Sequence, residues 1–482
     1  MIRFGKHFLA AVILAAFSFS GCVKPDKQNP DTDASLYYLI NAFPTWYNAL
    51  YNYRGPGVPM AVMADQVTWD FANFGYAQKF GGEPRLPFAN YYKSPDTYFI
   101  DRFWISAYEA LNYVNLTLQT LEQGGLISGF GPEDENMIRS WCYFLQGVIH
   151  GYLGLIFDKA VIQDEFTDPM QPVLSEWPAV LKSAVSSLDK SIQISGQGDF
   201  IIPDTWYSGP ALSAGDLAGI SSTFAAMFLA YGSRNAAQND STKWSLVESY
   251  AQSGIKSDFM IITDQQIWVN SMLEKAIGPG YGRVDNRVIH LFDSTYPAHY
   301  PADGLPPDPP DASSADARLD NDFEYLSTIN FAPENGTYLF SNYRLKKYDD
   351  WLPEMSGAIP FVTKTENDLL YAEALVRTGN TSEAINILNS STRIKRGHLP
   401  LLDPAATNHE VLEAIFYERE VELIGSGIGT AFYDMRRRDM LQKGTLLHFP
   451  VPAEELDIMG LPVYSFGGED HADGVNTSNG GW

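Results

Sequence analysis

The chain has 482 residues, 45% of them hydrophobic and 13% aromatic, so it can bury a large core and is not an intrinsically disordered protein. Its 58 acidic residues exceed its 33 lysines and arginines, which gives a net charge of -25. This charge argues against nucleic acid as a partner, because sequence-independent binding to a phosphate backbone requires a basic face.

The N-terminus has the features of a lipoprotein signal peptide. Arg3 and Lys6 precede an apolar run at residues 8–19, which is too short to span a bilayer and ends in Phe19-Ser20-Gly21-Cys22. Small residues directly before a cysteine resemble the lipobox of bacterial lipoproteins. We therefore expect residues 1–21 to be cleaved, Cys22 to carry the lipid, and residues 22–34 to form a tether. The alternative is an ordinary secreted protein in which Cys22 is a chance residue.

Apolar residues at helical spacing predict that residues 35–482 form a single, mostly α-helical domain. Gly379 and Asn380 interrupt this spacing and predict an αα-hairpin of the tetratricopeptide (TPR) kind, with Gly379 as a left-handed C-cap and Asn380 with Glu383 as a capping box. The predicted helices cover residues 35–53, 103–121, 137–157, 177–194, 214–237, 244–255, 367–378 and 410–424.

Three segments lack a helical period. Residues 65–98 are rich in aromatic residues and are expected to form a loop region. Closely spaced prolines in residues 278–322 predict a long irregular insertion without helix or central strand. Residues 464–482 are rich in glycine, asparagine and aspartate and offer little to pack.

These irregular segments contain the side chains that sugar binding requires. Flat aromatic faces stack on pyranose rings, and polar side chains bond the hydroxyl groups. Core packing or loop anchoring is the alternative interpretation of each aromatic residue. The candidates are Trp69, Phe74, Tyr76, Tyr91 and Tyr92 with the polar neighbours Asp65, Asp70, Asn73 and Arg85, then Tyr281, Tyr296 and Tyr300 in the proline-rich insertion, and Trp351.

No motif of a catalytic, metal or cofactor site is present in the sequence. It contains no His-Glu-x-x-His, Gly-x-Ser-x-Gly or Gly-x-x-x-x-Gly-Lys pattern. A glycosidase pair stays open as an alternative, because its two carboxylates can come from distant positions. Asp316, Asp320, Asp322 and Glu324 lack the EF-hand pattern, and we interpret them as a solvated acidic loop rather than a calcium site.

Three C-terminal blocks point to a known family. They are NDLLYAEALVRTGNTSEAINILNSSTRIKRG at residues 367–397, VLEAIFYEREVELIGSGIGTAFYDMRRRDML at 411–441 and HFPVPAEEL at 448–456. In this order they resemble the SusD/RagB family of outer-membrane nutrient-uptake lipoproteins. Ser426 departs from the family pattern, because many members have glutamate there. The family's motif positions fall on Glu373, Asn389, Arg393, Glu418, Arg419, Asp434 and Arg436. For Glu418, Arg419, Glu422, Asp434 and Arg436 we expect a structural ion-pair network between helix and turn rather than a catalytic set.

The resemblance implies a SusD-like fold, in which four TPR-like helix pairs form a scaffold and long irregular loops form the ligand face. It also implies a non-catalytic lipoprotein on the outer-membrane surface of a Gram-negative bacterium, with a role in polysaccharide utilization. Such a protein captures oligosaccharides and delivers them to a SusC-like TonB-dependent transporter. A peptide-binding RagB-like protein is the nearest alternative. A surface glycoside hydrolase and a purely structural adaptor are further alternatives.

Overall fold

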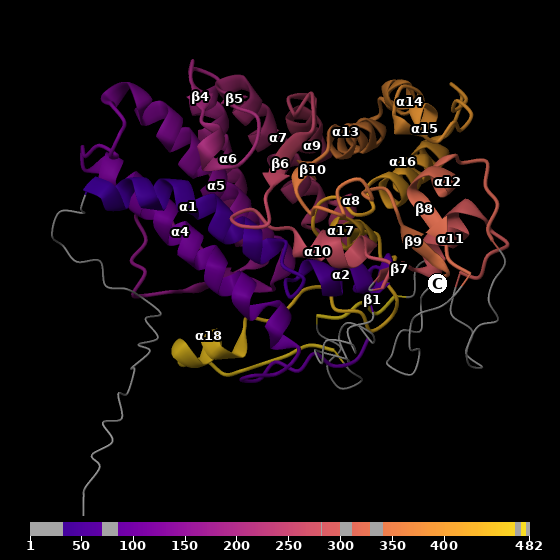
Figure 1. The fold of residues 1–482 in the computed structure, drawn as a ribbon, viewed down its shortest axis with the longest axis horizontal. Helices are drawn as coiled ribbons and strands as arrows, with labels where there is room; N and C mark the ends of the chain where they lie inside the picture. Colours follow the sequence, from indigo (N-terminus) through magenta and orange to yellow (C-terminus); the bar gives the residue numbers. More distant parts are fainter. Residues whose placement is uncertain are drawn as a thin grey trace, which may run out of the picture.

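The computed structural model of the chain describes residues 32–69, 85–280, 282–298, 311–327, 341–467 and 474–478. Helices dominate this part of the chain, as the sequence predicts, and the strands are short (Figure 1). Within the described residues, no helix is both long enough and apolar enough to cross a membrane. Cys22 and the expected signal peptide lie outside the described residues.

The long N-terminal helices lie side by side, and each contacts the next along the chain (Figure 1). The central helix α5 is almost entirely buried. Its glycines allow close packing, since a Cβ atom at Gly151 would lie 2.0 Å from the Phe228 ring and one at Gly147 would lie 2.7 Å from Leu188. The helices of this array are α1 (Thr32–Leu50), α4 (Asp101–Glu122), α5 (Glu135–Ile156), α6 (Trp177–Ser195) and α7 (Ala214–Tyr231).

A second group of helices continues from α7 through α9 (Trp244–Gln252) to α13 (Lys364–Thr378), which packs on α14 (Thr381–Asn389) and α16 (Asn408–Glu422). The turn between α13 and α14 has Gly379 in the left-handed region, at φ 95°, as predicted. The predicted capping box is wrong, because the Asn380 side chain makes no cap hydrogen bond. A description of the whole scaffold as four TPR-like pairs stays a prediction.

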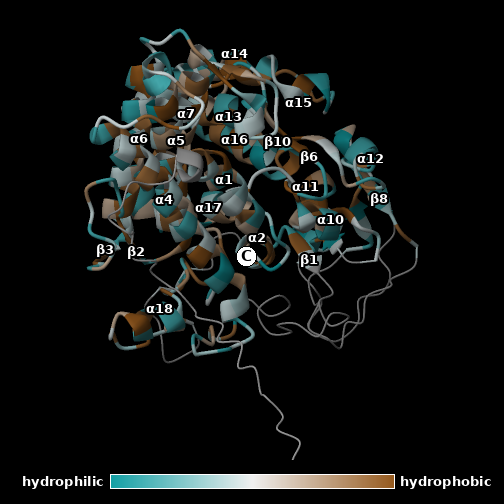
Figure 2. Ribbon diagram, turned by 60° about the vertical axis from the view of Figure 1, so that its left-hand side comes forward, coloured by the Kyte–Doolittle hydropathy of each residue, from teal (hydrophilic) through white to brown (hydrophobic). Residues whose placement is uncertain are grey.

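The strands form short antiparallel pairs around the helices. These pairs are β1 (Val67–Trp69) with β7 (Gly282–Val284), β2 (Lys159–Val161) with β3 (Leu174–Glu176), β4 (Ile201–Ile202) with β5 (Leu212–Ser213), β6 (Phe259–Thr263) with β10 (Gly357–Val362), and β8 (Phe323–Tyr325) with β9 (Tyr343–Leu345). Figure 2 shows hydrophobic residues concentrated on helix faces that turn toward neighbouring elements. In the described part of the chain each sheet has only two strands, so the strands do not form a layer of their own.

Two expectations about element boundaries are wrong. The proline-rich segment contains β7, α11 (Asn286–Phe292) and α12 (Arg318–Asp322), since its closely spaced prolines begin only at Pro297 and leave the flanking residues free to pair or coil. The predicted helix at residues 214–237 ends at Tyr231, because Arg234 turns inward and donates to the carbonyl oxygen of Gly154 at 2.7 Å. A separate short helix, α8 (Ala236–Asp240), follows.

The remaining short helices lie mainly in the segments that connect the scaffold helices. They are α2 (Gly57–Met63), α10 (Ser271–Ile277), α15 (Thr392–Lys395), α17 (Thr430–Arg437) and α18 (Ala453–Ile458), with 3-10 turns η2 (Thr97–Phe99), η3 (Pro132–Asp134) and η4 (Asp204–Trp206). Part of the C-terminal tail packs on the body, where the Asn476 side chain is buried and donates to the carbonyl oxygen of Leu441 at 2.6 Å.

Candidate functional site

Exposed tyrosines cluster in residues 85–100, which lead into α4 and are here called the aromatic loop. Tyr91, Tyr92 and Tyr98 are 58%, 63% and 47% exposed, respectively. Single exposed aromatic rings are common on protein surfaces, but three within eight residues form a local concentration of flat apolar surface. The aromatic loop is therefore the candidate ligand surface.

The aromatic loop is held in place by buried polar side chains. Asn90 donates to the carbonyl oxygens of Val451 and Tyr464 at 3.0 and 2.7 Å, and its Oδ1 accepts from the backbone N–H of Ala453 at 3.0 Å. Asp96 is 3% exposed, and its Oδ2 accepts from the backbone N–H of Ala89 at 2.7 Å. A loop fixed in this way presents its tyrosines without a large ordering cost on binding.

Cationic side chains lie against the exposed rings. The Lys93 ammonium is 4.8 Å from the centroid of the Tyr92 ring. The Arg54 guanidinium, just after α1, is 5.1 Å from the centroids of both Tyr53 and Tyr98. These are cation–π distances, so the charges help to orient the rings.

Two predicted polar neighbours of the aromatic residues bind one another beneath the surface. Asp65 is fully buried, and its carboxylate accepts from Arg85 Nη2 at 2.6 Å and from Gln442 Nε2 at 3.0 Å. Burial raises the pKa of Asp65, and the charge of Arg85 opposes that shift. Burial and the Asp65 charge also hold the pKa of Asp285 well above its usual range. The ion pair between Asp65 and Arg85 anchors the start of the aromatic loop.

Two predicted aromatic ligand residues lie in the core. Tyr296 is 4% exposed, and its ring centroid is 6.1 Å from that of Tyr343. Trp351 is 7% exposed, and its indole N–H donates to the Thr263 hydroxyl at 2.9 Å. In this conformation neither ring offers a face to a ligand. Their burial gives no support to the assignment of Tyr296 and Trp351 to the ligand site, which stays a prediction.

Most of the other predicted ligand residues lie outside the described part of the chain. The backbone of Trp69 pairs with Gly282 at the end of β1, but its side chain is not described. The residues outside the described ranges are Asp70, Asn73, Phe74, Tyr76, Tyr281 and Tyr300. The candidate surface therefore rests on Tyr91, Tyr92 and their neighbours.

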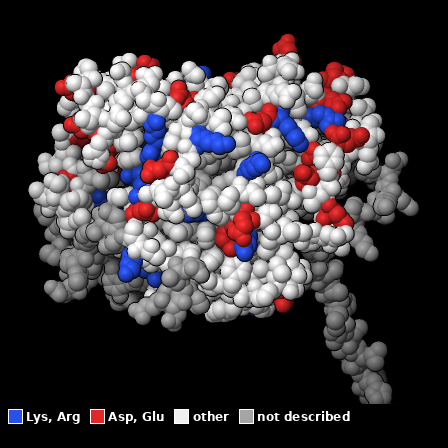
Figure 3. Space-filling model, turned by 180° about the vertical axis from the view of Figure 1, so that it is seen from behind, with Lys and Arg blue, Asp and Glu red and all other residues white. Residues whose placement is uncertain are grey.

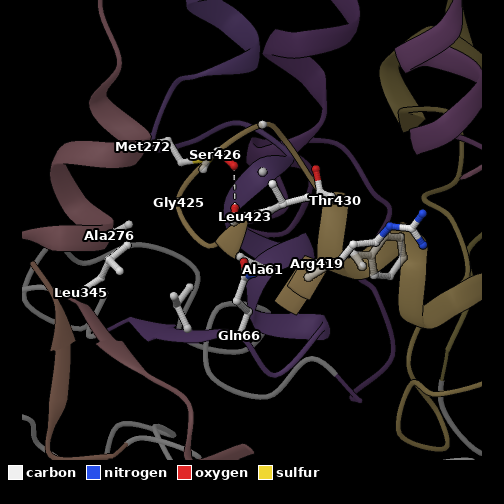
Figure 4. A pocket seen from close by; sticks show the side chains of 16 residues that line it. Ala61, Gln66, Met272, Ala276, Leu345, Arg419, Leu423, Gly425, Ser426 and Thr430 are labelled. Atoms are coloured by element: carbon white, nitrogen blue, oxygen red, sulfur yellow. Dashed lines mark hydrogen bonds between the residues drawn. The ribbon is translucent and has the colours of Figure 1, made fainter. Parts of the chain in front are cut away.

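A narrow pocket lies between α2, α10 and the turn after α16 (Figure 4). The turn contains Gly425, Gly427 and Gly429, all at positive φ. Two hydroxyl groups at its wall are bonded within the protein, since the Ser426 hydroxyl donates to the Leu423 carbonyl oxygen at 2.7 Å and the Thr430 hydroxyl to Glu366 at 3.3 Å. Both hydroxyl protons are therefore already used within the protein.

The family-motif residues on α13, α16 and α17 meet in a buried charge network. Glu373 accepts from Arg437 Nη1 and Nη2 at 2.8 and 2.6 Å, and from Arg419 Nη1 at 2.5 Å. Asp434 also pairs with Arg419 and Arg437, at 2.9 and 2.5 Å. Arg436 does not join, since it donates to backbone carbonyl oxygens, among them that of Leu155. Neighbouring residues of α17 point to different sides of the helix, so of Arg436 and Arg437 only Arg437 reaches Glu373.

A second network holds α12 against α16. Arg318 donates to both Glu418 oxygens at 2.7 and 2.9 Å and to Asp316 at 2.7 Å. Arg393 lies 3.6 Å from Glu418. The Asn389 side chain, at the end of α14, donates to the Leu402 carbonyl oxygen and accepts from the Leu402 backbone N–H. These charges are paired and buried, which is the arrangement of a structural network rather than of a reactive centre.

The interpretation of residues 316–324 as a solvated acidic loop is wrong for Asp316 and Asp322, which are buried because each pairs with an arginine. Asp322 pairs with Arg396 at 2.6 Å, and Glu324 pairs with Arg344. In the described ranges, no group of three histidine, cysteine, aspartate or glutamate side chains is arranged to hold a metal ion. Sequence reasoning missed the basic side chains Arg54 and Lys93. Each directly follows a tyrosine in the sequence, and this tyrosine–cation order is the signal that could have predicted them.

Comparison with known proteins agrees with the motif positions. Residues 365–450 match the sequence profile of the SusD family. A SusD homolog from Bacteroides thetaiotaomicron VPI-5482 has a similar structure, with a TM-score of 0.60 and 15% identity over 85% of this chain and 89% of that one. The protein is SusD-like. No curated protein matches the chain in sequence.

Other solved structures have the same SusD-like fold. A SusD superfamily protein from Parabacteroides distasonis ATCC 8503 matches with a TM-score of 0.59 and 13% identity over 90% of this chain and 98% of that chain. A SusD-like carbohydrate binding protein from Bacteroides vulgatus ATCC 8482 matches with a TM-score of 0.56 and 17% identity, over 85% and 84%. At such identities the likeness shows the fold alone. The buried network around Glu373 lies inside the profile match, so in this SusD-like protein the matched residues build the scaffold.

Proposed function

We propose that this SusD-like protein is a non-catalytic surface lipoprotein that binds oligosaccharides on the aromatic loop. The observation that carries the proposal is the fixed loop that exposes Tyr91 and Tyr92 to solvent. Rings held in this way stack on the C–H faces of pyranoses, while nearby polar groups bond the hydroxyls. The SusD-like fold and the carbohydrate-binding relative support the same class of ligand.

The open form of the aromatic loop favours a glycan over a peptide. A peptide site calls for an enclosed cavity with polar groups that bond the peptide backbone. The pocket beside Gly427 is narrow, and its Ser426 and Thr430 hydroxyls are already bonded within the protein. The exposed tyrosines instead lie on an outer surface, where a chain of sugars has access from the side.

The proposal extends to the protein's place in the cell. The lipobox at Cys22 supports attachment to the outer membrane of a Gram-negative bacterium, with the folded body outside the lipid. A SusC-like TonB-dependent transporter is the proposed partner that receives the bound oligosaccharide, because the SusD-like fold is associated with that role. The absence of a catalytic step is part of the proposal, and the experiment below tests it.

Isothermal titration against a panel of soluble oligosaccharides and peptide digests tests the proposed function. The protein for this experiment is the chain from residue 23 onward, which keeps every described residue. We expect heat with at least one oligosaccharide and no cleavage products. Because the loss of one stacking ring costs about 1 kcal/mol, Tyr92→Ala is expected to weaken binding about fivefold.

A matched variant separates the aromatic loop from tyrosines in general. Tyr37 on α1 is 52% exposed, and its ring meets that of Tyr113 edge to face. Tyr113 lies on α4 eleven residues beyond Arg102, about 17 Å further along that helix. Tyr37→Ala is expected to leave the affinity unchanged. Cleavage products would make the protein a hydrolase, and binding of peptides alone would favour the RagB-like alternative.

A further inference from the structure

The charges that reach solvent on the aromatic loop are positive, although the chain as a whole carries -25. Lys93 and Arg102 are exposed, and Arg102 lies in the first turn of α4, four residues after Tyr98. Arg54 adds a third cation next to the Tyr98 ring, at 5.1 Å from its centroid. Elsewhere the two signs of charge are interspersed, as the face in Figure 3 shows.

The carboxylates of the aromatic loop do not cancel these charges at the surface. Asp96 is 3% exposed, and its carboxylate is bonded to the backbone N–H of Ala89. Asp101 is largely buried and faces Glu454 and Glu455 of α18, whose charges, after burial itself, raise its pKa to about 7. Arg85 is already neutralised by Asp65.

The exposed Lys93 stands beside an exposed ring. Its ammonium is 4.8 Å from the Tyr92 centroid, so a sugar packed against that ring brings its substituents within reach of the charge. Arg102 is also exposed and follows Tyr98 by four residues in the sequence. A neutral glycan would use the rings and leave both cations without an ionic partner. A glycan with carboxylate or sulfate groups would use rings and cations together.

We infer that the aromatic loop, together with the first turn of α4, selects anionic oligosaccharides, in which a uronate carboxylate or a sulfate ester pairs with Lys93 of the loop and Arg102 of α4 while the sugar rings stack on Tyr92 and Tyr98. This inference rests on the proposed function, because it names the substrate class of the same site. Exposed ion pairs contribute up to about 1 kcal/mol each, so two of them favour the charged glycan by roughly tenfold.

Matched pairs of probes isolate the charge from the sugar ring. Oligogalacturonides are compared with their methyl-esterified forms, and sulfated galactan oligosaccharides with their desulfated forms, by isothermal titration of the chain from residue 23 onward. We expect roughly tenfold tighter binding of the charged member of at least one pair, and the pair that responds identifies carboxylate or sulfate. Raising the NaCl concentration from about 0.05 to about 0.5 M is expected to reduce this preference, because salt screens exposed charges.

Variants assign the preference to the named cations. Lys93→Gln and Arg102→Gln are each expected to weaken binding of the charged oligosaccharide about threefold to fivefold and to leave the neutral form unchanged. Lys256→Gln is the matched control. Lys256 is an exposed lysine just beyond α9, where its ammonium donates to the Gln252 carbonyl oxygen. This control is expected to change neither affinity.

The outcomes separate this inference from the proposed function. Equal affinity for the charged and neutral members, or a preference that survives Lys93→Gln together with Arg102→Gln, overturns the anionic selectivity while oligosaccharide binding stands. No binding to these probes or to any oligosaccharide of the wider panel overturns both. Circular dichroism of each variant confirms that a lost affinity does not reflect a lost fold.

Discussion

The buried charge network predicts that Glu373→Gln destabilises the protein strongly. Glu373 is fully buried and accepts hydrogen bonds from three arginines, at 2.8 and 2.6 Å from Arg437, 2.5 Å from Arg419 and 2.8 Å from Arg377. Glutamine keeps the size of the side chain, but it has no charge, and its amide N–H groups meet guanidinium donors. After the change, Asp434 is the remaining carboxylate at the meeting point of Arg419 and Arg437.

The expected cost of Glu373→Gln follows from these contacts. The arginines stay charged in the variant, because a guanidinium does not lose its proton in proteins and Asp434, which also raises the pKa of Arg419 and Arg437, is still present. Removing one partner of a buried ion pair costs about 3–5 kcal/mol, because an uncompensated charge stays in the interior. We therefore expect the free energy of unfolding to fall by about 3–5 kcal/mol.

Urea denaturation followed by tryptophan fluorescence measures this loss. The control is Glu413→Gln on α16, where the side chain is 60% exposed and the expected change is within about 0.5 kcal/mol. Adding Arg437→Met to Glu373→Gln is expected to cost less than the sum of the two single changes, since it removes the unpaired charge. A Glu373→Gln variant as stable as the control would refute the view that this network holds α13, α16 and α17 together.

Two further predictions concern pH and the aromatic loop. Burial raises the pKa of Glu366 from 4.5 to about 7, so its protonated form contributes stability that is present below pH 4.5 and is lost as the pH rises to about 7, about 3 kcal/mol in all. In the parent protein the urea midpoint is expected to be lower at pH 8 than at pH 5, and Glu366→Gln is expected to remove the part of this difference that Glu366 causes. A variant with the same difference between the two midpoints as the parent protein would contradict the prediction. Asn90→Ala deletes the hydrogen bonds to Val451, Ala453 and Tyr464 and is expected to speed amide hydrogen exchange in residues 89–96, measured by mass spectrometry; exchange as slow as in the parent protein would show that the loop has another anchor.

The scaffold helices were predictable because their signals are local. An apolar period of 3.6 residues marks α4, α5 and α6, and the structure places their ends within two residues of the prediction at Phe103, Met137 and Trp177. The left-handed C-cap at Gly379 was predictable for the same reason, since a positive φ is favoured by glycine itself and does not depend on distant residues.

The site depends on contacts that no local pattern contains. Asn90 meets residues 361 and more positions away in the chain, and a sequence window cannot show which of several asparagines makes such a contact. The buried charge network includes Arg437 rather than the predicted Arg436, because the choice depends on how α17 is rotated against α13. Tyr296 and Trp351 look like ligand residues by type alone, and only the fold shows that they are buried.

A crystal structure of the protein with its tightest-binding oligosaccharide tests the central claim most directly. The proposed function predicts intact sugar rings stacked on Tyr91 or Tyr92, with the aromatic loop in the conformation described above. An oligosaccharide bound away from this loop, or a cleaved product beside a carboxylate, would contradict the claim that this surface is a binding site without catalysis.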